Sequence, residues 1–230
     1  MAKAGDEIVN PRTGQRLVFL ETGEENDGEL VRIDSYNPPT GVPEPEHVHP
    51  FQESGAEVLS GSLRFSVGGE QRSVKAGESI TIPANTPHNF WNDGEEEAHA
   101  VQWLRPALKA DSFFESFFGL AQDGKLNDKG LPPLLQLAVG VAHFGDEIRL
   151  TSPPWRVQRV LFGALAPIGR LFGYRPEYPY WHASTQESTA GEERRPSSAT
   201  RTMTGSVVVA AFAAVIKVFI VLQRRRRGGK

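Results

Sequence analysis

Two short blocks of the sequence hold histidine and carboxylate side chains at spacings that suit a metal ion. In the first block, EHVHPFQE at residues 46–53, His47 and His49 are two residues apart. On an extended strand their side chains point to the same side, so both imidazoles can reach one ion. Three residues then separate His49 from Glu53, which is close enough to fold back as a carboxylate ligand.

The second block, residues 76–92, brings one more histidine. Ile80 and Ile82 alternate with polar residues and predict a strand that ends at Pro83, after which an Ala-Asn-Thr-Pro turn delivers His88. Three neutral imidazoles and a carboxylate suit a divalent transition metal such as Fe, Mn, Ni, Cu or Zn. The chain has no cysteine, which excludes thiolate ligands and disulfides. We therefore predict one metal site, formed by His47, His49, Glu53 and His88.

The elements that must position these ligands are mainly strands. Short apolar runs separated by turn residues continue to about Pro106, and Leu63, Phe65 and Val67 alternate with polar residues as in a half-buried strand. The expected strands are 16–21, 29–34, 56–60, 62–67, 79–83 and 98–104. Many short strands at this spacing are typical of a β-sandwich or β-barrel.

Over residues 40–106, the two blocks resemble the motifs of the cupin superfamily. The first motif, G-x5-H-x-H-x3,4-E-x6-G, resembles His47-x-His49-x3-Glu53 followed by Gly61, although seven residues rather than six precede this glycine. The position with six-residue spacing is Ser54, which leaves a three-histidine site as the alternative. The second motif, G-x5-P-x-G-x2-H-x3-N, resembles the segment from Gly77 to Asn92, where Asn85 replaces a glycine. That replacement is mild, because asparagine tolerates a positive φ.

The resemblance implies a mainly β fold, a single cupin double-stranded β-helix (jelly-roll barrel), with an α-helical extension after it. It also implies a metal-dependent oxidoreductase of dioxygenase type that acts on a small organic molecule, with Glu53 as the catalytic base. A non-catalytic module that binds or senses a small molecule, or a cupin isomerase, is the alternative. Phe51, Phe90 and Trp91 flank the ligands and form either core or the wall of a substrate pocket.

The second half of the chain changes to a helical pattern. We expect the barrel at 1–108, a helical extension at 109–182, a disordered linker at 183–205, a hydrophobic membrane-anchor helix at 206–223 and a basic tail at 224–230. Ser112 and Glu115 suggest a capping box before a face of phenylalanines. Prolines 132 and 133 open a second helix, and a third runs from Trp155 to Phe172 with an interruption at Pro167. The phenylalanine face packs in the core, caps the barrel or joins two protomers as a homodimer.

Charge is distributed unevenly along the chain. Residues 1–110 carry 18 acidic and 9 basic side chains, whereas nine basic residues and no acid follow Glu193. The acidic body argues against nucleic-acid binding. Residues 207–222 are apolar except for Lys217 and precede four arginines, so we expect membrane attachment with the cupin domain in the cytoplasm. The alternatives are a segment lying in the membrane interface, a buried helix, or a soluble cytoplasmic protein.

Overall fold

The computed structural model describes residues 2–41, 43–128, 130–178 and 180, which belong to one compact unit. In chain order its strands are β1 (Glu7–Val9), β2 (Arg16–Glu21), β3 (Val31–Asn37), β4 (His47–Val48), β5 (Glu53–Ser60), β6 (Ser62–Val67), β7 (Glu70–Lys75), β8 (Ser79–Ile82), β9 (His88–Trp91), β10 (Ala98–Arg105) and β11 (Arg149–Leu150). Its helices are the short 3-10 helix η1 (Gly23–Asn26), α1 (Ala110–Gln122), α2 (Leu134–Phe144) and α3 (Trp155–Leu171).

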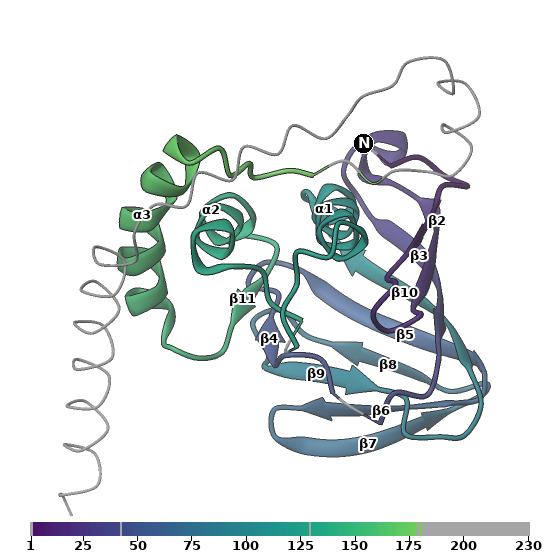
Figure 1. The fold of residues 1–230 in the computed structure, drawn as a ribbon. Coiled ribbons are helices and arrows are strands. Elements are labelled where there is room, and N and C mark those ends of the chain that lie inside the picture. The colour runs from purple at the N-terminus through teal and green to yellow at the C-terminus, as the bar shows by residue number, and fades with distance from the viewer. Residues whose placement is uncertain (1, 42, 129, 179, 181–230) are drawn as a thin grey trace, which may run out of the picture. The chain divides into compact units, whose positions relative to one another are not determined.

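The strands form two antiparallel sheets that face each other (Figure 1). One sheet has the order β1-β2-β3-β10-β5-β8 and the other the order β11-β4-β9-β6-β7. Inward-pointing apolar residues fill the space between them, among them Phe19, Ile33, Val58, Leu63 and Phe65. This arrangement confirms the predicted mainly β cupin fold with helices after the barrel.

The predicted strands are present. The observed strands that were not predicted lack a simple alternation of apolar and polar residues. β2 and β6 have the predicted bounds, and β3, β5, β8 and β10 overlap their predicted ranges. β7 was not predicted, because Val74 is its one buried residue and the rest of the strand is polar. β11 is two residues long and pairs with β4, so a strand from the helical half of the chain completes the second sheet. The predicted domain boundary at residue 108 remains a prediction.

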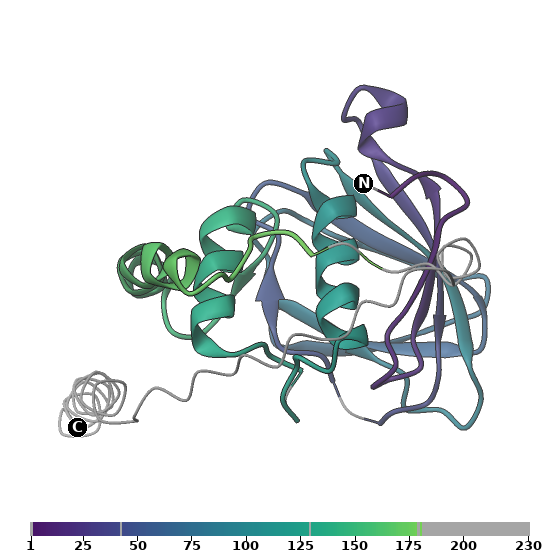
Figure 2. The ribbon, with the colours of Figure 1, turned by 45° about the horizontal axis from the view of Figure 1, so that its top comes forward.

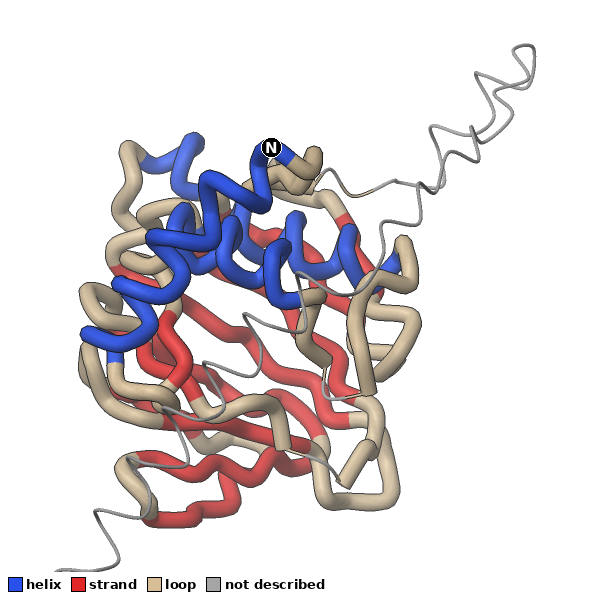
Figure 3. Tube along the Cα trace, turned by 60° about the vertical axis from the view of Figure 1, so that its left-hand side comes forward, coloured by secondary structure: helices blue, strands red, loops and turns tan. Residues whose placement is uncertain are grey.

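The helices lie on one side of the strands (Figure 3). From the sheets outward, the order is α1, α2 and α3 (Figures 1 and 2). Gly169 of α3 packs so closely on α2 that an added Cβ would lie 2.7 Å from Val139 Cγ2 and 2.9 Å from the Leu135 carbonyl oxygen. The third helix is thereby held directly against the second.

Two details of the helix prediction are wrong. α1 begins at Ala110, so Ser112 is buried inside its first turn and the predicted capping box does not form. Instead, the Glu147 carboxylate accepts a hydrogen bond from the Lys109 backbone nitrogen at 3.2 Å and satisfies a donor at this helix end. α3 runs through Pro167 without interruption. Because Gly163, four residues earlier, is exposed, its carbonyl can bond to water in place of the missing N–H.

Within the part of the chain that the structure describes, no helix has both the length and the apolar character needed to cross a membrane. The predicted linker, membrane-anchor helix and basic tail at 183–230 lie outside the described residues.

Candidate metal centre

Three of the predicted ligands come together on the inner side of the second sheet. His47 in β4 lies directly opposite His88 in β9, and His49 follows two residues after His47. One ring nitrogen from each histidine lies within 4.8 Å of one from each of the others. His49 and His88 are 8% and 5% exposed, and His47 is half-buried. The pairing of two strands has brought histidines from both sequence blocks to one point.

Each of these imidazoles is oriented by a backbone carbonyl. The Nδ1 atom of His47 lies 2.9 Å from the Pro45 oxygen, that of His88 lies 2.8 Å from the Thr86 oxygen, and that of His49 lies 2.6 Å from the Glu147 oxygen. A carbonyl oxygen can only accept, so each Nδ1 carries the proton and each Nε2 keeps a lone pair. This is the arrangement in which protein histidines ligate metals.

Electrostatics keep the cluster in the form that binds metal. Burial lowers the pKa of His49 to about 4. Burial also lowers the pKa of His47, well below its usual value, and that of His88. The neighbouring imidazoles add to this effect, because a second positive charge would be repelled. The three rings are therefore neutral at pH 7, and the donor set fits a divalent transition metal.

Glu53, the fourth predicted ligand, does not join the three histidines. It is the first residue of β5 and its side chain is exposed on the outer face, as is that of Glu57 four residues later. Side chains alternate along a strand, so Ser54 and Ala56 point inward instead. Ser54 is buried, lines the cavity described below, and its Oγ has no hydrogen-bond partner. The geometry corresponds to the three-histidine alternative, with a serine at the inward position.

The turn before His88 explains why Asn85 is tolerated. Asn85 has a φ of 59°, in the left-handed region that asparagine adopts more readily than most residues. Its backbone nitrogen donates a hydrogen bond of 2.7 Å to the His49 carbonyl oxygen. The turn thus ties the two histidine blocks together.

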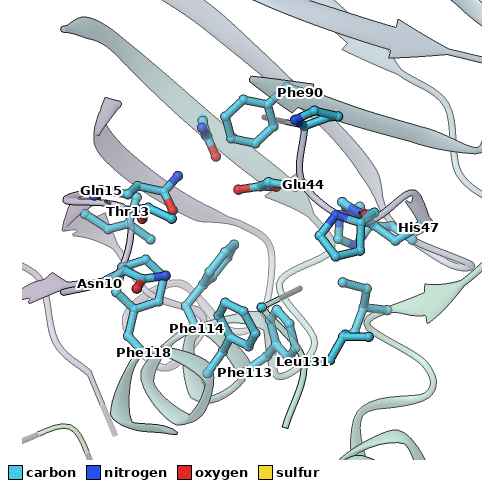
Figure 4. A pocket seen from close by; sticks show the side chains of 18 of the residues that line it. Asn10, Thr13, Gln15, Glu44, His47, Phe90, Phe113, Phe114, Phe118 and Leu131 are labelled. Carbon is cyan, nitrogen blue, oxygen red and sulfur yellow. Dashed lines mark hydrogen bonds between the residues drawn. The ribbon is translucent and has the colours of Figure 1, made fainter. Parts of the chain in front are cut away.

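The histidines open onto a cavity of about 740 Å³ (Figure 4). Phe90 and Trp91 line it, and their place in a substrate pocket remains a prediction. Phe51 is 58% exposed and is absent from the lining; the Arg149 guanidinium lies 5.5 Å from the centre of its ring. A volume of this size, lined mostly by apolar side chains with a few polar groups, is typical of a small-molecule site.

Several residues of the site were not predicted from the sequence. Four phenylalanines of α1 (Phe113, Phe114, Phe117 and Phe118) form one wall of the cavity, so the predicted phenylalanine face serves both the core and the cavity. Glu147, between α2 and β11, supplies the carbonyl that orients His49. Glu44 points into the cavity from the loop before β4. Glu44 lies in the PEPEH segment, residues 43–47, which has no alternation of apolar and polar residues that would distinguish it from a surface glutamate.

Comparisons with known proteins agree with this architecture. The cupin domain family matches residues 36–103. The "Probable oxidoreductase yanE" of Aspergillus niger is 30% identical over 159 residues, which cover 62% of this chain and 60% of that protein. The "Probable oxidoreductase patJ" of Penicillium expansum is 26% identical over 191 residues, which cover 74% of this chain and 56% of that protein. The chain thus spans about 60% of the length of these curated relatives.

Among solved structures, KdgF from Halomonas sp. is 17% identical and covers 40% of this chain and 79% of its own, with a TM-score of 0.36. The match of the cupin domain family to residues 36–103 coincides with the two motif blocks and with strands β3 to β10 of the barrel. Residues 36–103 of the chain therefore form a cupin domain.

Proposed function

We propose that this cupin is a metal-dependent oxidoreductase of dioxygenase type that acts on a small, largely apolar organic molecule. The observation that carries the proposal is the cluster of three imidazoles, two of them buried and one half-buried, each with its Nδ1 bonded to a carbonyl, at the wall of a cavity of about 740 Å³. The relatives named as oxidoreductases support the reaction class.

The residues proposed to hold the metal are His47, His49 and His88. A divalent ion held by them would supply Lewis-acid and redox chemistry to a molecule in the cavity. Three protein ligands leave more open positions than four, so the absence of Glu53 from the cluster is compatible with catalysis. The protein itself keeps the imidazoles neutral and oriented, and its apolar walls exclude water from the substrate.

The cavity walls favour a substrate with an aromatic or otherwise flat apolar body. Phe113 and Phe114 line the cavity on the helical side, and Phe90 lines it from β9. Aromatic pairs gain about 0.5–1.5 kcal/mol beyond the burial of their area. The polar side chains of Asn10, Gln15 and Glu44 also line the cavity and would orient such a molecule.

Oxygen consumption tests the proposal. The purified chain is loaded with Fe(II) or Mn(II) and supplied with a panel of hydroxylated aromatic compounds, while dioxygen is followed with an electrode. We expect uptake that requires both metal and substrate, incorporation of labelled dioxygen into product, and loss of both in His47→Ala. Substrate binding or isomerisation without any oxygen uptake would overturn the dioxygenase assignment in favour of a binding module or an isomerase.

A further inference from the structure

Glu44 is a carboxylate held at a defined place in the cavity. Its backbone is fixed to β9 at two points: its nitrogen donates to the Phe90 oxygen at 3.3 Å, and its oxygen accepts from the Asn89 side-chain amide at 3.0 Å. It lies three positions before His47 along the chain. Because the backbone is pinned on one side, the side chain extends into the cavity rather than into solvent (Figure 4).

The carboxyl group lies between the polar and the metal-facing parts of the cavity. In Figure 4, Gln15 and Thr13 lie on one side of it, His47 on the other, and Phe113 and Phe114 on the wall facing it. The Gln15 side-chain amide donates a hydrogen bond to it. A molecule that stacks on the phenylalanines therefore meets Glu44 and the histidine cluster along the same face.

Burial among these apolar groups raises the pKa of Glu44 to about 7, and the hydrogen bond from Gln15 opposes only part of this rise. Around it, the described charged or titratable residues of the cavity lining are Arg12, Asp128, His47, His49 and His88. Arg12 is engaged elsewhere, since its guanidinium donates to the Asp128 carbonyl oxygen at 3.1 Å. The three imidazoles are neutral at pH 7, because burial lowers their pKa values. A carboxyl group in this setting accepts and releases a proton near neutral pH.

We propose that Glu44 is a catalytic residue that binds the hydroxyl group of a hydroxylated aromatic substrate and accepts its proton. In this step the substrate O–H bond breaks, the proton moves to a carboxylate oxygen of Glu44, and the electron pair stays on the substrate oxygen. The proton returns to water when the product leaves. This inference rests on the proposed function for its place in a reaction, but the binding of the hydroxyl group is measurable without turnover.

The substrate class follows from the cavity. The phenylalanine wall accepts a flat ring, and Glu44 is the anionic acceptor that the ring's hydroxyl would meet. Above pH 7 the ionised carboxylate accepts a hydrogen bond of the charge-assisted kind, which is about twice as strong as a neutral one. An ether of the same ring has no proton to donate. A cationic amine is the competing ligand for a buried carboxylate near aromatic rings.

The test uses 2-naphthol, 2-methoxynaphthalene and 2-naphthylmethylamine as fluorescent probes. Their affinities are measured between about pH 5.5 and 8.5, with the metal-loaded full chain, for wild type, Glu44→Gln and Glu57→Gln. Glu57→Gln makes the same change on the exposed outer face of β5. For wild type and Glu57→Gln we expect naphthol affinity to rise roughly fivefold to tenfold with pH, with a midpoint near the Glu44 pKa of about 7. The affinity for the ether should show no such rise in any of the three proteins. The affinity of Glu44→Gln for naphthol should show none either.

Metal content and melting temperature are measured on the same samples. Glu44→Gln should hold metal as wild type does, so a loss of the pH response cannot be ascribed to an empty or unfolded site. If the protein binds no metal and consumes no oxygen yet keeps the Glu44-dependent response, the hydroxyl-binding role stands and the proposed oxidoreductase function falls. An unchanged response in Glu44→Gln, no naphthol binding by wild type, or tighter binding of the amine than of naphthol would each overturn the inference.

Discussion

Two substitutions, His88→Ala and Glu53→Ala, test which residues hold the proposed metal. His88 is 5% exposed and lies opposite His47, whereas Glu53 is exposed at the start of β5. A ligand that binds only the native state at 100 times its Kd stabilises that state by about 2.7 kcal/mol. For a chain of this size, 1 kcal/mol shifts Tm by about 2–4 °C, so saturating metal should raise Tm by about 5–10 °C.

We expect this metal-induced rise in wild type and in Glu53→Ala, and little or none in His88→Ala. The assay is thermal unfolding followed by circular dichroism, with and without Fe(II), Mn(II), Ni(II) or Zn(II), together with elemental analysis. Glu53→Ala should also change the Tm of the metal-free protein little, because substitutions of exposed residues change stability by within about 0.5 kcal/mol. Loss of the metal-induced rise in Glu53→Ala would show that Glu53 ligates after all. A full rise in His88→Ala would refute the three-histidine site.

Two further predictions concern stability. In the metal-free protein, the His49 pKa of about 4 lies below the unfolded value of 6.5, so the unfolded state binds more protons between these values and stability falls as pH drops through this window. His49 contributes on the order of 3 kcal/mol to this fall in the free energy of unfolding. Urea unfolding of His49→Gln should therefore show a shallower fall of the free energy of unfolding with pH than wild type. Equal slopes in the two proteins would contradict a buried neutral imidazole. Gly169→Ala should destabilise the folded protein by about 1–3 kcal/mol, because the added Cβ would clash with α2. Gly163 has open space around it, so Gly163→Ala should stabilise the folded protein by up to about 1 kcal/mol. Equal effects of the two substitutions in urea unfolding would argue against close packing of α3 on α2.

Local pattern was enough to predict several strands of the barrel and the shared side of two of its histidines. His47 and His49 share a side because side chains alternate on a strand, and this holds whatever the rest of the fold does. The alternation of Leu63 and Phe65 likewise predicted β6 with its observed bounds. Asn85 at a positive φ follows from the intrinsic tolerance of asparagine.

Other features depend on strand register and on contacts between residues far apart in the sequence. Glu53 and Ser54 are adjacent, and a shift of one residue exchanges the inner and outer faces of a strand, so only the register of β5 against β10 decided which points inward. Glu147 reaches His49 across 98 residues of sequence, and no local pattern encodes such a contact. Glu44 differs from a surface glutamate only because β9 holds its backbone and α1 covers the cavity. The burial that raises its pKa is a property of the assembled walls, and it exists only in the folded chain.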